Sequence, residues 1–180
     1  MEPRIRYAQT ATVKGGWNVE PRPKGPREHI PPILLEGGQG TIHTGLPTHV
    51  LKADSKATRG AYSLYEETFP PGYPGPAIHI HHDQEEAFYM IAGELTFLLG
   101  DQLIPANAGT FVLVPAGWRH GFANRSSEVA RVINIHSPRG FEHYFEQIGK
   151  WAVSGSNASS IRQFAKEHDV EIVGRPLGPG

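Results

Sequence analysis

The sequence predicts an all-β protein: a jelly-roll barrel, also called a double-stranded β-helix, followed by two short C-terminal helices. Glycine and proline are frequent, at 21 and 16 of 180 residues, which favours short strands and turns over long helices. Short apolar or alternating runs recur at regular spacing, and turn residues separate them. Beyond residue 140 the apolar residues recur every three or four positions, as on one face of a helix.

The predicted strands follow one another closely, as in a barrel of antiparallel hairpins. We expect strands at residues 48–53, 61–69, 86–92, 94–99, 111–114, 121–124 and 129–136. A further strand carries His79 and His81, and Gly100-Asp101 is a hairpin turn. The barrel is predicted from about residue 31 to 138.

The two ends of the chain differ from the barrel. Residues 1–30 are polar and proline-rich, and are predicted to be an arm because they bury little apolar surface. Residues 31–180 are predicted to be one domain that includes both C-terminal helices. The first helix places Phe141, Phe145 and Ile148 on one face, and the second is expected to be capped by Ser159 or Ser160. Both are expected to pack outside the barrel, and a short extended segment is expected at residues 169–174.

Charge and composition exclude several classes of function. The chain has 17 Lys and Arg against 18 Asp and Glu, so there is no basic surface for nucleic acid or an anionic membrane. The sequence shows neither an apolar run of membrane-spanning length nor an N-terminal apolar segment, which predicts a cytoplasmic protein. There is no cysteine, so a metal would be held by histidine and carboxylate.

Four residues form a candidate metal site. His79 and His81 are two apart, so in a strand both side chains point to one face. Glu86 opens the next apolar run, and a Pro-Ala-Gly turn precedes the distant His120. Three imidazoles and a carboxylate suit one divalent transition metal such as Fe, Mn, Co, Ni, Cu or Zn, and leave coordination positions free.

These residues lie in two segments that resemble the paired motifs of the cupin superfamily. The first motif is a His-x-His, four residues, a Glu, six residues and a Gly, which His79, His81, Glu86 and Gly93 satisfy. Every position of the second motif is matched by Gly109, Pro115, Gly117, His120 and Asn124. The chain departs from the pattern at Tyr73, where the family has a glycine, although Gly72 and Gly75 flank it.

Residues 32–177 are also similar to cupins related to quercetin 2,3-dioxygenase. This resemblance implies a metal-dependent dioxygenase that acts on a hydroxylated aromatic or enolisable small molecule, with Glu86 as metal ligand and catalytic base. A non-redox isomerase, cyclase or lyase, and a small-molecule-binding protein without turnover, remain open alternatives. Because cupins commonly pair and open sheet edges need cover, we also expect a homodimer.

Strand parity indicates which side chains share a face with the candidate ligands. Phe88 and Met90 lie on the same face as Glu86, and Phe122 lies on the same face as His120. These three residues are the predicted substrate pocket, and an apolar lining of this kind suits a flat phenolic ligand. Four further residues are weaker pocket candidates, because the sequence does not determine which way their side chains point: Tyr65, Trp118, Asn134 and His136.

Overall fold

The computed structural model describes residues 30–43, 47–138, 141–154 and 157–179. Residues Ile33–Gly180 form one compact unit. Apart from Ile30, the arm predicted for residues 1–30 lies outside the described residues, so it stays a prediction. Within the described ranges, no helix is long and apolar enough to cross a membrane.

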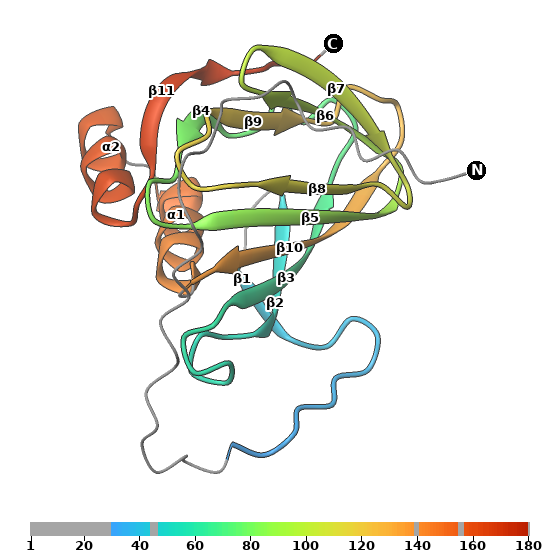
Figure 1. Cartoon of the computed structure of the whole chain (residues 1–180), viewed down its shortest axis with the longest axis vertical. Helices are drawn as coiled ribbons and strands as arrows, with labels where there is room; N and C mark the ends of the chain where they lie inside the picture. The colour runs from blue at the N-terminus through green and yellow to red at the C-terminus, as the bar shows by residue number, and fades with distance from the viewer. Residues whose placement is uncertain (1–29, 44–46, 139–140, 155–156, 180) are drawn as a thin grey trace, which may run out of the picture. The chain divides into compact units, whose positions relative to one another are not determined.

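The strands form two antiparallel sheets that face each other (Figure 1). One sheet has the order β1-β2-β3-β10-β5-β8 and the other has the order β11-β4-β9-β6-β7. The strands are β1 (Thr41–His43), β2 (Thr48–Ala53), β3 (Ser63–Phe69), β4 (Ala77–Ile80), β5 (Glu85–Ala92), β6 (Glu94–Leu99), β7 (Gln102–Asn107), β8 (Phe111–Val114), β9 (His120–Ala123), β10 (Ala130–Ser137) and β11 (Glu171–Pro176). The predicted jelly-roll class is confirmed.

Two strands were not predicted from the sequence. β1 has only three residues, which is too short for a recognisable alternation. β7 contains Pro105, which usually argues against a strand, yet β7 is the last strand of its sheet. A proline is tolerated at such an edge because its missing N–H faces away from the neighbouring strand.

The inward face of the larger sheet changes from apolar to polar along its strands. In β3 every second residue is buried, from Ser63 through Glu67 to Phe69. Phe69 pairs with Ala130 at one end of β10, whereas His136 at the other end pairs with both Ser63 and Glu86. The strands therefore carry an apolar core at one end and buried polar groups at the other.

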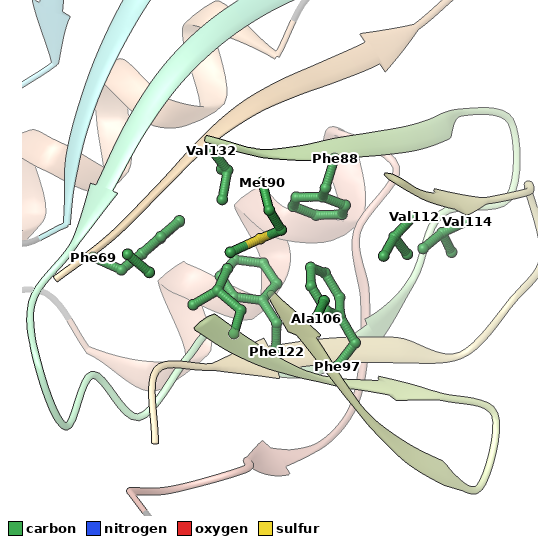
Figure 2. Packing of buried hydrophobic residues seen from close by; sticks show 11 residues of the cluster. Phe69, Phe88, Met90, Phe97, Ala106, Val112, Val114, Phe122 and Val132 are labelled. Carbon is green, nitrogen blue, oxygen red and sulfur yellow. The ribbon is translucent and has the colours of Figure 1, made fainter. Parts of the chain in front are cut away.

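The apolar end is a compact core built by both sheets (Figure 2). Phe88 and Met90 on β5 meet Phe97 and Phe122 from the opposite sheet, and the Phe88 and Phe97 ring centroids are 5.0 Å apart. Burying a large apolar side chain of this kind stabilises a fold by about 1.5–3 kcal/mol. The buried polar groups of the other end do not belong to this core, although Phe69 and Phe122 of the core extend toward them.

The two C-terminal helices are α1 (Glu142–Ser154) and α2 (Ala158–Glu167). The N-cap of α2 is Asn157, whose side chain accepts a hydrogen bond from the Ser160 amide. The prediction that Ser159 or Ser160 caps this helix was therefore wrong, because the helix begins at Ala158 and already includes both serines. A second apolar cluster joins the start of α1, α2 and the residues before β11, centred on Phe141, Ala165 and Val170.

Candidate metal centre

The structure brings the four candidate ligands together at the polar end of the barrel. His79 on β4 and His120 on β9 are directly paired across the smaller sheet. Glu86 on β5 approaches from the larger sheet, and His81 follows β4 by one residue. One potential ligand atom from each of the four lies within 4.8 Å of those of the others, and all four residues are buried. The cluster therefore bridges the two sheets.

Each of the three imidazoles is oriented by a backbone carbonyl at its Nδ1. The Nδ1–oxygen distances are 2.8 Å for His79 to Ala77, 2.7 Å for His81 to Asp169 and 2.9 Å for His120 to Trp118. A proton held at Nδ1 leaves Nε2 as the ligand atom. The Nε2 atom of His81 is buried and has no hydrogen-bond partner. A buried nitrogen without a hydrogen-bond partner destabilises the fold unless another group binds it, and a divalent cation would fit at this position.

Glu86 lies at the centre of the cluster. One carboxylate oxygen, Oε2, lies 2.9 Å from His120 Nε2 and 3.6 Å from His81 Nε2, while Oε1 accepts a 2.9 Å hydrogen bond from Asn134. Burial by itself raises the pKa of Glu86, but the neighbouring His136, His120 and His81 outweigh it and hold the pKa well below the usual value. Glu86 is therefore an anion at neutral pH, as a ligand must be.

The histidines differ in how readily they lose a proton. Burial, together with the nearby His120, lowers the pKa of His79 to about 3, so its imidazole is neutral and able to coordinate. Burial also lowers the pKa of His81, but its contact with Glu86 outweighs this and raises the pKa overall. A cation must displace the His81 proton, so metal binding strengthens as the pH rises through this raised pKa.

Asp169 holds the loop that follows the ligand strand, a role that the sequence did not reveal. It lies just past the end of α2 with a left-handed backbone, φ 60°, a conformation that Asp adopts more readily than most residues. Its carboxylate accepts hydrogen bonds of 2.8, 2.9 and 3.0 Å from the amides of His82, Asp83 and Gln84. With the carbonyl contact to His81, one residue of the C-terminal segment positions a ligand and its loop.

We expect Asp169→Ala to lower metal affinity by about 10- to 100-fold, the usual effect of losing contacts that orient a ligand. Asp169→Asn keeps the left-handed backbone accessible and should move the affinity in the same direction, because an amide replaces one acceptor oxygen. Competition titration with a chromophoric chelator measures the effect. Asp101→Ala, at an exposed carboxylate paired with Arg119, is the matched control. Equal affinity in Asp169→Ala and Asp101→Ala would refute the positioning role.

Two of the weaker candidates from the sequence, Asn134 and His136, lie beside Glu86. His136 Nε2 is 3.6 Å from Glu86 Oε1, and both its ring nitrogens are buried without a hydrogen-bond partner. Its ring stacks on Phe141, with centroids 4.4 Å apart and planes at 5°. Burial lowers the pKa of His136 to about 4, so this fourth imidazole is neutral. Tyr65 is fully buried behind it, with an edge-on ring contact at 6.2 Å.

A cavity of about 320 Å³ opens on the metal-site residues His79, His81 and Glu86. Six aromatic rings line it: Phe69, Tyr73, Phe122, Phe141, Tyr144 and Phe145. Of these, Tyr144 and Phe145 come from α1, and further lining residues come from α2 and β11. The helices therefore form a wall of the cavity as well as packing against the barrel.

The predicted pocket residues do not share one location. Phe122 lines the cavity, whereas Phe88 and Met90 lie in the apolar core and are not among its lining residues. The alternation of side chains along a strand correctly placed Phe88 and Met90 on the inward face of β5. Each step of two residues, however, moves about 6.6 Å along the strand. Phe88 and Met90 are therefore too far along β5 to reach the cavity, and the sequence pattern gave no sign of this distance.

The departure from the family pattern at Tyr73 has a structural explanation. Gly75 has φ +84°, and a Cβ atom there would lie 1.7 Å from the Phe122 carbonyl oxygen. Gly75 thus provides the close approach that requires glycine, and Tyr73 is free to stack on Phe69, with centroids 5.3 Å apart. The motif residue Asn124 is buried and donates to the carbonyls of Phe69, Pro70 and Glu128, so it fastens the loop below the site.

Comparisons with known proteins agree with this geometry. The family model described as Cupin domain matches residues 65–136, a span that contains all four candidate ligands. Quercetin 2,3-dioxygenase of Bacillus subtilis is 30% identical over 119 residues, which cover 66% of this chain and 35% of that protein. The HTH-type transcriptional regulator PuuR of Escherichia coli is 28% identical over 113 residues, covering 61% and 55%. The chain spans between about a third and about half of the length of these relatives.

Solved structures show the same fold at low sequence identity. A predicted oxalate decarboxylase from Thermotoga maritima matches with a TM-score of 0.56 and 16% identity, over 59% of this chain and 99% of that one. An RmlC-like cupin from Shewanella frigidimarina matches with a TM-score of 0.50 and 19% identity, over 62% and 92%. The two-sheet barrel and the spacing of the four candidate ligands agree with the family match, which identifies residues 65–136 as a cupin domain.

Proposed function

We propose that this protein is a metal-dependent dioxygenase that acts on a small hydroxylated aromatic or enolisable molecule. The observation that carries the proposal is the shared cavity: His79, His81 and Glu86 open into a space lined by six aromatic rings. Its volume of about 320 Å³ lies at the lower end of the usual range for ligand pockets, about 300–1,000 Å³. The likeness to quercetin 2,3-dioxygenase of Bacillus subtilis supports the same class of reaction.

The four ligands would hold one divalent transition metal. A bound ion of this kind would supply a Lewis acid and, when redox-active, a path for electrons from the substrate to dioxygen. The aromatic walls orient a flat ring and exclude water from the cluster. Backbone carbonyls hold the three imidazoles, of which His79 is neutral, and so keep the donor nitrogens in place. The cavity is thus preorganised for a ligand whose oxygen reaches the cluster.

Glu86 is the residue proposed to accept the proton of that substrate oxygen. Its carboxylate is fixed by Asn134 on one oxygen and faces His120 with the other. Because neighbouring imidazoles hold its pKa well below the usual value, Glu86 is a weak base. An efficient transfer therefore needs an acidic hydroxyl, and phenols and enols are the common ones. This reasoning favours the proposed substrate class over simple alcohols or sugars.

Two other functions use the same residues. A non-redox isomerase, cyclase or lyase would use the metal only as a Lewis acid. A ligand-binding protein without turnover would use the cavity alone, and the likeness to the transcriptional regulator PuuR supports it. The cluster itself suits all three, because iron, nickel and zinc accept the same His and carboxylate ligands.

Metal analysis and oxygen consumption together test the proposal. Protein purified without added metal is analysed first, and the protein is then loaded separately with iron, manganese, cobalt and nickel. Oxygen-electrode assays over a panel of flavonols and polyketide-type phenols should show uptake with at least one of these metals. Zinc alone in the purified protein, with anaerobic turnover of a panel member, would assign the non-redox function. Ligand binding without turnover under any condition would assign the third.

A homodimer is part of the proposal. The outer face of β5 and β8 carries four exposed apolar residues, Tyr89, Ile91, Phe111 and Leu113, and β8 is an edge strand. Apolar groups grouped on an open sheet edge are a common site of pairing. We expect a dimer by light scattering at micromolar concentration and a monomer for Phe111→Asp. Leu103→Asp, at an exposed leucine of the other sheet, should stay dimeric. A monomeric wild-type protein would contradict this proposal.

A further inference from the structure

A second pair of chemically active side chains lines the cavity that contains the metal-site residues. His49 on β2 and Glu67 on β3 are cross-strand partners, and both belong to the cavity lining. His49 Nδ1 lies 2.6 Å from Glu67 Oε1. Glu67 is on the inward face of β3, with 2% of its side chain exposed, while His49 is 17% exposed. Neither residue belongs to the candidate metal ligands.

The orientation of the His49 ring leaves one of its nitrogens available to a ligand. A carboxylate at Nδ1 of a histidine fixes the proton there and leaves Nε2 as a hydrogen-bond acceptor. His49 Nε2 makes no hydrogen bond with any residue that the structure describes. A hydrogen bond between a neutral imidazole and a carboxylate contributes little net stability on its own, so folding alone gives little reason to place this pair in the cavity.

Aromatic contacts connect this pair to the metal end of the cavity. The His49 ring stacks on Phe145 of α1, with centroids 4.3 Å apart and planes at 23°. The same Phe145 meets His136 edge-on at 5.7 Å, and His136 lies 3.6 Å from Glu86. His49 and Glu86 therefore line the cavity at two separate places, and aromatic side chains lie between them. A ligand that fills it would meet Glu86 with one group and His49 with another.

We propose that His49, oriented by Glu67, determines substrate specificity by accepting a hydrogen bond from a second hydroxyl of the ligand. The preferred ligand is then an aromatic molecule with two separate oxygen functions, one directed to the metal cluster and one to His49 Nε2. This inference rests on the proposed substrate class but not on the reaction, because recognition of the second hydroxyl needs no turnover. A hydrogen bond between a substrate hydroxyl and this neutral imidazole contributes about 0.5–1.5 kcal/mol, or about 2- to 10-fold in affinity.

The test compares two probes that differ only away from the metal-binding group. Quercetin and 3-hydroxyflavone share the 3-hydroxy-4-carbonyl unit, but 3-hydroxyflavone lacks the other hydroxyls. Both are titrated by fluorescence quenching against zinc-loaded protein, which does not consume oxygen. The wild-type protein should bind quercetin about 2- to 10-fold more tightly than 3-hydroxyflavone, as estimated above. His49→Phe keeps the ring stack on Phe145 and should remove this preference, with 3-hydroxyflavone affinity and zinc content unchanged.

Two more variants separate recognition from folding. Glu67→Gln can still accept from Nδ1 but has no charge, so it should reduce the preference only in part. Glu66→Gln is the matched control, since Glu66 is the next residue on β3, faces outward and pairs with Lys52 and Arg131. It should keep the full preference. A full preference in His49→Phe, or failure of both probes to bind the wild-type protein, overturns the proposal. Absence of oxygen uptake would remove only the dioxygenase function and leave this result standing.

Discussion

His120→Ala is expected to strip the metal from the protein while the barrel stays folded. A four-ligand site in a small protein contributes about 10–16 kcal/mol of binding free energy. An equal share for each ligand is about 2.5–4 kcal/mol, which corresponds to an affinity loss of roughly 10²- to 10³-fold. His120 is fully buried and is the candidate ligand nearest to Glu86 Oε2, at 2.9 Å.

The barrel should survive because the apolar core does not include His120. The variant loses its ring contacts with His79 and His81 and leaves Glu86 Oε2 without its nearest partner, a cost of about 1–3 kcal/mol. Mass spectrometry of metal content and circular dichroism of the same samples check both statements. His82→Ala is the matched control, because His82 is exposed and pairs with Glu171 at the surface. Full metal content in His120→Ala would show that His120 is not a ligand.

Glu86→Gln is expected to reduce turnover far more than it weakens substrate binding. A neutral amide does not take the proton of a substrate hydroxyl, and loss of a positioned base lowers the rate by about 10²- to 10⁴-fold. The amide still fills the same space and still reaches Asn134, so the cavity keeps its shape. The rate constant kcat should therefore fall while the affinity for a substrate analogue changes little.

The experiment must separate the base from the ligand, since Glu86 is proposed to be both. Turnover is measured at saturating metal and divided by the metal content of each sample. Glu85→Gln, at the exposed neighbouring residue, removes the same charge outside the site and is the matched control. If the rate for each bound metal is the same in Glu86→Gln and in the wild-type protein, Glu86 is a ligand without a role as base. A fall equal to that of Glu85→Gln would also contradict the prediction.

Local sequence patterns were sufficient for the fold and for the four candidate ligands. A strand has a side-chain period of two, so the alternation in residues 61–69 predicted the inward face of β3 directly. The ligand spacing predicted the cluster for the same reason: His79 and His81 share a face, and turns bring Glu86 and His120 back to it. The alternation and the spacing both relate residues that are close in sequence, so they can be recognised in one sequence without a structure.

The surroundings of the cluster depended on contacts between distant segments. Asp169 meets the loop after His81 across 85 to 87 residues, and His49 meets Glu67 across 18. Phe88 and Met90 had the predicted face but lie in the core, because parity determines the side of a strand and not the position along it. The sequence by itself determined the barrel and the four residues of the buried cluster. Only the tertiary structure decided which residues orient the ligands and form the cavity, since register and helix packing bring together residues that no local period relates.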